Sequence, residues 1–465
     1  MDILVLFIVL VASVWALNFV KFSGLAGGFV AVLFIGSCFS YPFFKVGPLT
    51  LDRIMLIALF GFYAIVRAQG SARAIRFAKS DILLIVFMLV MAFSTFSHNW
   101  GAHDGKTAIN LVVFYLMPAA MYWMAKNSHF DEQQVAFLLS FFALFAVYLG
   151  LVGVAERFEL NYLVFPQYII SQKYPEFLGR ARGPFLNPCA NGLFLTAGVA
   201  AAILSWSKLM LLGRVLMTGA ATISVIGIVC TMTRSVWIGA AMAIAVLVTA
   251  TIPRQLRFGF VISILIVGSV GMTVSWASLQ SFKRDKNVTV EDMQKSAELR
   301  PMLAIVAIEM FRDRPLLGFG FGQYLEESLP YFSARVSNRP IELAKHYVQH
   351  NVVLSLLTEC GLIGASLYVL LLGTWLVSAC VLMNKRAVSL AKRQQGLLFV
   401  CVFCSFAVSG FFQDMTIVSM SHMLLFFLGG LVMSLSTNPE QGFAKSQVKE
   451  PAVDQVADEI LSPIC

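Results

Sequence analysis

The chain has 465 residues, of which 58% are hydrophobic and only 13% are charged. Ordinary soluble domains contain about 45–50% apolar and about 25% charged residues, whereas the mean hydropathy here is +0.80. A soluble domain of this size has too little interior to bury so much apolar surface. The composition therefore excludes a soluble enzyme, a coiled coil and a disordered chain, and it predicts a protein dissolved in a lipid bilayer.

Apolar runs recur along the chain, and most approach the length of about 20 residues that a transmembrane helix needs. They lie at roughly 2–20, 24–44, 50–66, 81–97, 107–125, 133–155, 190–206, 214–231, 235–252, 258–276, 351–382, 396–413 and 416–436. Strands of a membrane barrel would be about 10 alternating residues long. We therefore predict an all-α polytopic membrane protein with about 12–13 transmembrane helices.

The first run carries Asp2 and lacks a basic segment before it, so we expect a retained helix and no signal peptide. Lys and Arg set the orientation, because basic short loops stay in the cytoplasm. The loops with Arg67–Lys79 and Lys385–Arg393 are the most basic. We expect these loops and the polar tail on the cytoplasmic side of the membrane. Thirteen spans would place the N-terminus outside, and only that end would move if the first two runs are not both full spans.

The predicted organisation has five parts. They are N-terminal transmembrane helices over 1–155, transmembrane helices with arginine motifs over 156–276, a periplasmic loop subdomain over 277–350, C-terminal transmembrane helices over 351–436 and a cytoplasmic tail over 437–465. The loop subdomain has nearly balanced charges, so we expect no nucleic-acid partner. Within it, Glu298–Arg312 has the apolar spacing of a helix, and a Gly-rich stretch follows.

Four arginines lie at or near the membrane surface on its predicted outer side, namely Arg180, Arg182, Arg234 and Arg300. A charge so close to hydrocarbon is costly, and it indicates a functional site unless the side chain only reaches to the interface. The guanidinium fork matches phosphate oxygens. Several such groups on one membrane face therefore favour a diphosphate ligand.

His350 stands where the large outer loop enters the membrane, and a neutral imidazole there can accept a proton from a hydroxyl. A capping or packed histidine is the alternative. Glu342, His346 and His350 have a spacing that could ligate zinc, but further ligands are not evident. No two acidic residues stand two apart, and no phosphate-binding Gly-Lys loop occurs. We therefore expect no metal and no cofactor.

These elements resemble the bacterial O-antigen ligase and O-antigen polymerase superfamily. Its typical order is an Arg before Gly-x-x-x-Asn-Pro-Asn, then Thr-x-Ser-Arg-x-x-Trp, an outer-loop Arg, Asp-x-Pro-Leu-Leu-Gly-x-Gly-x-Gly and His-Asn-x-x-Leu-x-x-Leu-x-Glu-x-Gly. The matching stretches here are Arg182–Cys189 (RGPFLNPC), Thr231–Trp237 (TMTRSVW), Arg300, Asp313–Gly322 (DRPLLGFGFG) and His350–Gly361 (HNVVLSLLTECG). Cys189 replaces the usual Asn, and Thr233 replaces the usual Ser.

The resemblance implies a glycosyltransferase fold of the GT-C type that acts on the periplasmic face. Its donor would be a glycan on undecaprenyl diphosphate, and its acceptor a second glycan, lipid A core or a protein. Arg182, Arg234 and Arg300 would bind the diphosphate, and His350 would be the catalytic base. Arg180, Asn187 and Asn351 would support the site. Membrane lipids and a chain-length regulator would be further partners.

Some alternatives stay open at this level. Glu359 either orients a partner in the site or is paired within the helix bundle, which we favour. A lipid-linked glycan transporter would also be polytopic with intramembrane arginines, but it would show an internal repeat. A scaffold without activity would not need His350. Polymerisation is favoured slightly over ligation, because nothing marks a specialised acceptor.

Overall fold

The computed structural model describes residues 23–39, 45–46, 49–70, 75–100, 106–253, 255–263, 290–333, 344–345, 347–385 and 388–436. In the helix that begins at Val290, side chains are described from residue 299 onward. The predicted span at 2–20, most of the span at 258–276 and the tail from 437 lie outside the described residues. The same holds for His346 and Glu342 of the predicted zinc spacing.

Helices dominate the described part of the chain, and eight of them are long and apolar enough to cross a membrane. The eight are α3 (Lys79–Phe96), the continuous α4 (Lys106–Leu111), η2 (Val112–Leu116) and α5 (Met117–Lys126), α6 (Glu132–Arg157), α7 (Pro188–Trp206), α8 (Leu211–Cys230), α9 (Arg234–Thr251), α14 (Val352–Asn384) and α16 (Ser419–Ser436). This confirms the prediction of an all-α polytopic membrane protein.

Three more apolar runs of the sequence are also helical. They form the helix Ser23–Cys38, α2 (Leu51–Ala68) and α15 (Leu390–Gly410). The short elements are β1 (Lys45–Val46), β2 (Leu49–Thr50), η3 (Asn161–Leu163), η4 (Gln167–Ile170), η5 (Gly183–Phe185), α12 (Tyr324–Glu327) and α13 (Leu329–Ser333). Strands β1 and β2 pair antiparallel, a small addition to the predicted helical fold.

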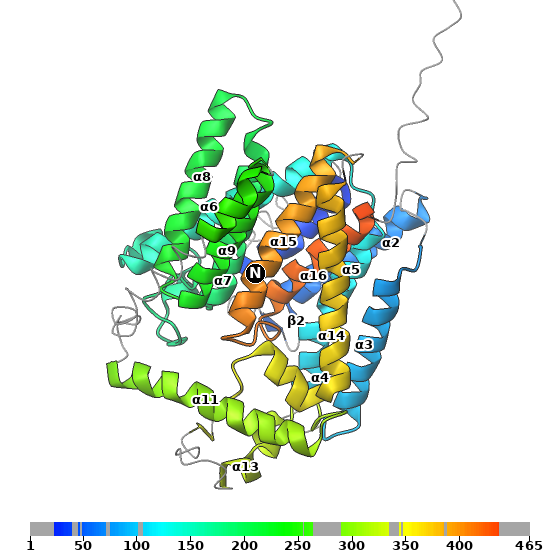
Figure 1. Cartoon of the computed structure of the whole chain (residues 1–465), viewed down its shortest axis with the longest axis vertical. Helices are drawn as coiled ribbons and strands as arrows, with labels where there is room; N and C mark the ends of the chain where they lie inside the picture. Colours follow the sequence, from blue (N-terminus) through cyan, green and yellow to red (C-terminus); the bar gives the residue numbers. More distant parts are fainter. Residues whose placement is uncertain are drawn as a thin grey trace, which may run out of the picture.

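The spanning helices form two groups that share α15 (Figure 1). Helices α6, α7, α8 and α9 pack together, while α3, α5, α14 and α16 form the second group. Helix α15 contacts α7 and α9 on one side and α14 and α16 on the other. Helix α11 (Val290–Asp313) crosses one end of this bundle and contacts α14. We call this end, where the predicted outer loops lie, the outer face.

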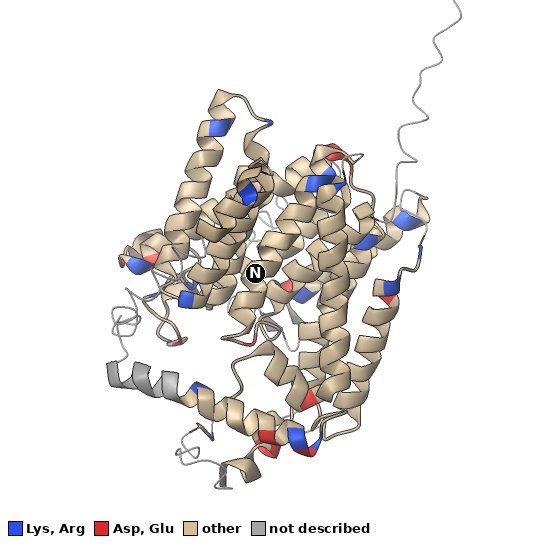
Figure 2. Ribbon diagram, in the orientation of Figure 1, with Lys and Arg blue, Asp and Glu red and all other residues tan. Residues whose placement is uncertain are grey.

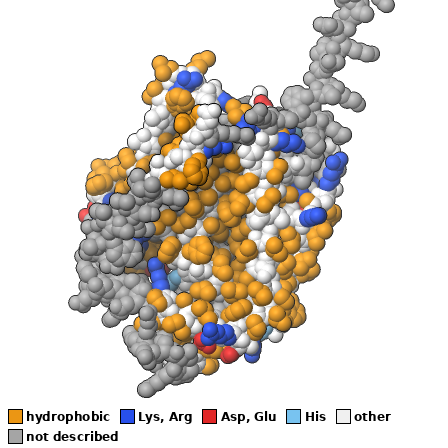
Figure 3. All heavy atoms as spheres, in the orientation of Figure 1, with side chains coloured by type: hydrophobic (Ala, Val, Ile, Leu, Met, Phe, Trp, Pro, Cys, Tyr) orange, Lys and Arg blue, Asp and Glu red, His pale blue; other side chains and the backbone are white. Residues whose placement is uncertain are grey.

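The surface of the bundle suits a bilayer. Long stretches of the helices carry no charged residue, and most Lys and Arg residues lie toward the two ends (Figure 2). On the face drawn in Figure 3, apolar side chains cover the helices, and basic side chains border them above and below. Side chains such as Leu89 in α3 and Val377 in α14 are 63% exposed. Such exposure is stable only against lipid or another apolar partner.

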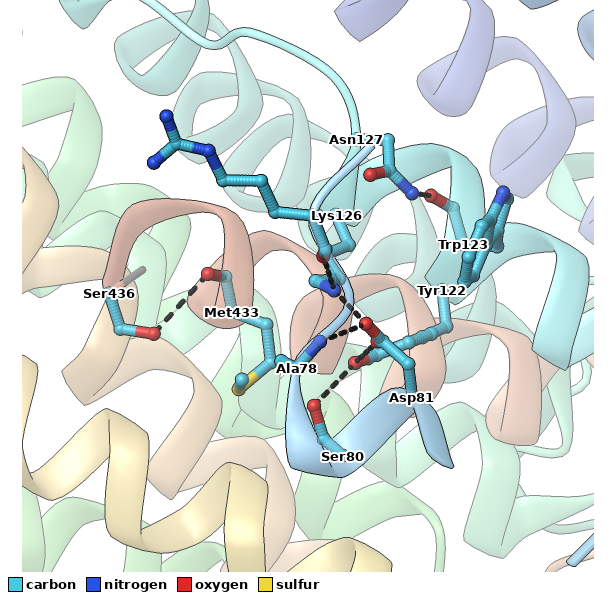
Figure 4. A network of polar contacts seen from close by, with 10 residues as sticks. Ala78, Ser80, Asp81, Tyr122, Trp123, Lys126, Asn127, Met433 and Ser436 are labelled. Carbon is cyan, nitrogen blue, oxygen red and sulfur yellow. Dashed lines mark hydrogen bonds and ion pairs between the residues drawn. The ribbon is translucent and has the colours of Figure 1, made fainter. Parts of the chain in front are cut away.

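A buried ion pair fastens α3 to α5 at the end opposite α11 (Figure 4). The Lys126 ammonium pairs with the Asp81 carboxylate and donates to the Arg76 carbonyl at 2.8 Å. The Tyr122 hydroxyl donates to the other Asp81 oxygen at 2.8 Å, and its ring stacks on Trp375 of α14. A buried charge pair needs such additional hydrogen bonds to offset its desolvation. The network therefore stabilises this end of the bundle.

Helix α14 is broken at Gly361, whose φ of 63° and ψ of −168° are not helical. The Gly-rich segment Pro315–Gly322, which follows α11, lies in this break. The amides of Phe319 and Gly320 donate to the carbonyls of Thr358 and Glu359, both at 2.9 Å. In a regular helix, those two carbonyls would accept from residues 362 and 363.

The amides released by the break are satisfied by the same segment. Leu362 donates to the Pro315 carbonyl at 2.8 Å, and Ile363 donates to the Leu316 carbonyl at 3.3 Å. The inserted segment thus replaces the missing helical partners on both sides of Gly361. Because buried backbone groups must be paired, this exchange fixes the outer loop to α14.

Replacing Gly361 with Ala should destabilise the protein, because a Cβ there would lie 2.3 Å from the Leu316 carbonyl oxygen and φ is positive. We expect a loss of at least about 2 kcal/mol. Gly373→Ala in the same helix is the control, since a Cβ there meets no atom within 4 Å. Thermal unfolding of both variants in detergent gives the comparison. Equal unfolding temperatures for the two would contradict the role of the break.

Candidate functional site

The first turns of three helices lie on the outer face near α11. Helix α7 begins after Asn187, α9 begins at Arg234, and α14 begins after Asn351. The Cys189 Sγ of α7 lies 3.8 Å from the Ser235 Oγ of α9, so these two helix ends touch. The start of a helix has a partial positive charge and favours anions.

Arg180 and Arg234 both act electrostatically on Arg300 at this place. Arg300 on α11 experiences the charges of Arg180 and Arg234, and it also lies in the electrostatic range of Cys189. Partial desolvation lowers the pKa of Arg300, the Cys189 thiol raises it, and the two like charges lower it further. The guanidinium groups stay charged even so. Their mutual repulsion would be relieved by an anion placed between them.

Arg234 has unused hydrogen-bonding capacity within the described part of the chain. Its Nε atom is buried and has no hydrogen-bond partner there. Arg180 is buried, and its guanidinium stacks over the Phe177 ring at 5.2 Å. A buried donor without a partner is costly. An incoming oxyanion would satisfy Arg234.

The side chain of Arg182 lies elsewhere than its predicted role requires. It is fully buried, and its Nε donates to the Ile169 carbonyl at 2.9 Å. Its two terminal nitrogens donate to the carbonyls of Tyr174 at 2.6 Å, Glu176 and again Ile169. This guanidinium is therefore occupied by backbone oxygens of the 158–187 loop and does not join the other arginines.

The same loop is also held by the side chain of Glu156, at the end of α6. Its carboxylate accepts the backbone amides of Arg182 at 3.2 Å and Gly183 at 2.9 Å. The Asn191 side chain of α7 donates to the Ala181 carbonyl at 2.9 Å. Arg182 and these contacts give the loop a fixed shape, which places Arg180 beside α7 and α9.

The two predicted supporting asparagines are helix caps. The Asn187 Oδ1 accepts the amides of Cys189 at 2.9 Å and Ala190 at 3.2 Å. The Asn351 Oδ1 accepts the amides of Val353 at 2.8 Å and Leu354 at 3.0 Å. Such caps satisfy donors at the start of a helix. They fix the backbone beside Arg180 and His350 and leave the ligand to other groups.

His350 lies one residue before the cap of α14 and is exposed. Partial desolvation and the nearby Arg300 lower its pKa, whereas Asp414 raises it. The net shift is downward from the ordinary 6.5, so the imidazole is neutral at pH 7. A neutral imidazole beside a cation is suited to accept a proton. Arg300 therefore connects His350 to the arginines.

Asp414 was not singled out from the sequence, although it belongs to this site. It is 4% exposed, lies between α15 and α16, and acts electrostatically on His350. Burial raises the pKa of Asp414 above its ordinary value, and the hydrogen bonds from Thr416 and Ser355 and the nearby His350 offset only part of that rise. An acid in the short connection between two apolar runs was the available signal. We call Arg180, Arg234, Arg300, His350 and Asp414 the outer-face cluster.

Glu359 on α14 pairs with backbone groups of the Gly-rich segment. Its carboxylate accepts the backbone amides of Gly322 and Tyr324, and its carbonyl accepts the Ser94 hydroxyl at 3.1 Å. It therefore holds the Gly-rich segment in the break of α14. Among the described residues, no group of three or more His, Cys, Asp or Glu side chains is arranged to hold a metal ion.

Fold and site together define a polytopic membrane protein with a cluster of arginines and one histidine on its outer face. Residues 219–369 match the family model described as O-Antigen ligase, which supports the resemblance to the O-antigen ligase and O-antigen polymerase superfamily. The family indicates a glycosyl-transferring enzyme. The matched region contains Arg234, Arg300, the Gly-rich segment and His350. No curated protein matches the chain at a significant level.

Arg182→Met should lower stability strongly, because it removes the donor that the carbonyls of Ile169, Tyr174 and Glu176 share. Each lost partner costs about 1–3 kcal/mol. Arg180→Met is the matched control two residues away, and it should lose less stability. Denaturation of both variants in detergent measures the difference. A more stable Arg182→Met protein than Arg180→Met protein would contradict the structural role of Arg182.

Proposed function

We propose that this protein transfers a glycan from undecaprenyl diphosphate to an acceptor hydroxyl on the periplasmic face of the bacterial inner membrane, without a metal ion. The observation that carries the proposal is the outer-face cluster. It brings Arg180, Arg234 and Arg300 together with His350, although these residues are far apart in the sequence. The superfamily supports glycosyl transfer, and the cluster supports its chemistry.

In the proposed step, the acceptor oxygen attacks the anomeric carbon of the donor glycan, and the bond from that carbon to the diphosphate breaks. Negative charge grows on the leaving diphosphate. Arg180, Arg234 and Arg300 stabilise that charge, as do the first turns of α7, α9 and α14. A diphosphate is a good leaving group and needs no proton. The proposed cation set therefore supplies what a divalent metal would supply elsewhere.

His350 takes the proton of the acceptor hydroxyl in the same step. The imidazolium that forms is stabilised by the Asp414 carboxylate, which favours the charged form of the ring. Exposure of His350 gives an acceptor access from the aqueous side. Apolar side chains exposed on α8 and α9, such as Val229 and Ile238, offer the polyprenyl chain a surface beside Arg234.

Polymerisation and ligation share this step and differ in the acceptor. We propose a second lipid-linked glycan as the acceptor, with lipid A core or a protein as the alternative. The family description of O-Antigen ligase favours the alternative. Deleting the gene separates the two, because a polymerase mutant lacks long glycan and a ligase mutant accumulates it unattached.

The proposal is tested directly with the purified protein, a lipid-linked oligosaccharide and EDTA. We expect release of undecaprenyl diphosphate to continue when divalent ions are removed. Complete loss with EDTA that Mg²⁺ or Mn²⁺ restores would contradict the metal-free step. A protein that moves the donor between leaflets of a vesicle but consumes none of it would be a transporter.

Arg234→Ala should abolish transfer while the protein still inserts in the membrane, because the diphosphate loses a bidentate partner. Arg234→Lys should recover little of the rate, since an ammonium keeps the charge but lacks the planar fork. Initial rates of diphosphate release and donor affinity are the measurements. A near-normal rate for the Lys variant would leave Arg234 only a diffuse electrostatic role.

His350→Ala should lower the transfer rate by about 10²–10⁴-fold and leave donor affinity nearly unchanged, because the arginines hold the diphosphate. The wild-type rate should still hold at pH 6.5, the ordinary pKa of imidazole, and should fall only at lower pH, because the lowered pKa of His350 keeps the base neutral at pH 6.5. His346→Ala is the control and should cost much less. Equal loss of donor binding and rate in His350→Ala would make His350 a phosphate ligand.

A further inference from the structure

The membrane span Lys106–Lys126 contains a π-helical turn, η2, that has a clear cause in the sequence. Pro118 has no amide hydrogen, so it cannot donate to the Phe114 carbonyl four residues earlier. The turn widens, and the Met117 amide reaches back to the Val112 carbonyl. The Phe114 carbonyl accepts instead from His422 Nδ1 at 2.6 Å. Such turns often occur at functional sites.

The widened turn directs Tyr115 toward the connection between α15 and α16. The Tyr115 hydroxyl donates to Thr416 Oγ1 at 3.2 Å, and the Thr416 hydroxyl donates to Asp414 Oδ1 at 2.6 Å. The Thr416 amide donates to the same carboxylate oxygen at 2.9 Å. All three side chains are buried. Each hydroxyl in this series donates to the next group, so the hydrogen bonds point in one direction from the π-helical turn to Asp414.

The ring of Tyr115 is held on several sides, so its hydroxyl has little freedom. Its centroid lies 5.8 Å from that of Phe87, 5.5 Å from that of Phe321 and 5.4 Å from that of His422, with edge-on geometry in each case. Phe321 belongs to the Gly-rich segment in the α14 break. The same packing therefore connects Tyr115 to the outer loop that carries Arg300.

Asp414, at the end of this series of hydrogen bonds, lies within electrostatic range of His350. Ser355, one turn into α14, also donates to its carboxylate, and Asn351 Nδ2 donates to the Phe411 carbonyl at 3.1 Å. The connection with Asp414 is thus fastened to the start of α14. The charged and titratable groups that act on Asp414 and His350 are Arg300, Glu359, Tyr115 and Tyr368 besides each other.

We propose that Tyr115 and Thr416 are positioning residues, which orient the Asp414 carboxyl group and favour its ionised form through a series of hydrogen bonds, so that Asp414 can act on His350. The proposal rests on the proposed function of His350 as the base. A carboxylate that accepts charge-assisted hydrogen bonds is fixed more firmly than one that packs alone. Neither Tyr115 nor Thr416 touches the reacting atoms in this scheme.

The matched control for Tyr115 is Tyr368. Both phenols are 2% exposed, and both rings pack against Phe87 and His422. The Tyr368 hydroxyl contacts His422 Nε2 at 3.0 Å and is not part of the chain to Asp414. Tyr→Phe at either position removes one buried hydroxyl and keeps the ring. A loss of general packing should therefore affect both variants alike.

Rates and donor affinities of the full-length protein test the proposal first. Tyr115→Phe should lower kcat by about five- to tenfold with donor affinity within about twofold of the original, whereas Tyr368→Phe should change kcat less than about twofold. Tyr115→Phe added to Asp414→Asn should cost nothing further, because both act through one carboxylate. Additive losses, or equal losses for both tyrosines, would overturn the positioning role.

A second measurement does not depend on activity. Diethyl pyrocarbonate modifies neutral imidazole, so the pH midpoint of modification at His350, followed by mass spectrometry, reports its pKa. Asp414→Asn should lower this midpoint, and Tyr115→Phe should lower it by about half a unit or less, with no change for Tyr368→Phe. An unchanged midpoint in Tyr115→Phe would overturn the proposal. Shifted midpoints in a protein that consumes no donor would support the chain and refute the proposed function.

Discussion

The exchange of backbone hydrogen bonds at Gly361 is the constraint on which the outer face depends. A break in a membrane helix leaves amides and carbonyls that lipid cannot satisfy, so such a break persists only where protein supplies the partners. The segment Pro315–Gly320 supplies them on both sides of the break, and the Glu359 carboxylate holds the residues that follow. Helix α11 is therefore fixed relative to the first two turns of α14.

The attachment of α11 to α14 brings Arg300 and His350 together. Arg300 belongs to α11, and His350 lies just before the start of α14. Arg180 reaches the cluster because Arg182 and Glu156 give the preceding loop a fixed shape. Asp414 reaches it because its connection is fastened to the start of α14. Each charged group is thus held by a neighbour that has no role in the chemistry. Such preorganisation is what electrostatic stabilisation of a leaving group requires.

The lengths of the apolar runs predicted most of the spans, and the arginines near the membrane surface predicted much of the site. Both signals follow from the cost of placing charge or unpaired backbone in lipid. The spans from α6 to α9 and α14 to α16 lie within a few residues of their predictions, and α11 extends the predicted Glu298–Arg312 helix toward its start. Arg180 and Arg182 could not be distinguished, because the carbonyls that occupy Arg182 come from a loop whose path has no periodicity. The role of Tyr115 could not be predicted from the sequence for a similar reason. The direction of its side chain depends on the amide hydrogen that Pro118 lacks and on partners about 300 residues away.

The central claim is that Arg180, Arg234 and Arg300 form the binding site of a lipid-linked diphosphate. Cryo-electron microscopy of the protein in a lipid nanodisc, with a non-hydrolysable phosphonate analogue of an undecaprenyl diphosphate glycan, tests this most directly. We predict the two phosphorus groups within hydrogen-bonding distance of these three guanidinium groups, the anomeric carbon toward His350, and Arg182 still bonded to its loop carbonyls. Density for the analogue away from α7, α9 and α11, or with Arg182 turned out to bind it in place of Arg180, would contradict the account.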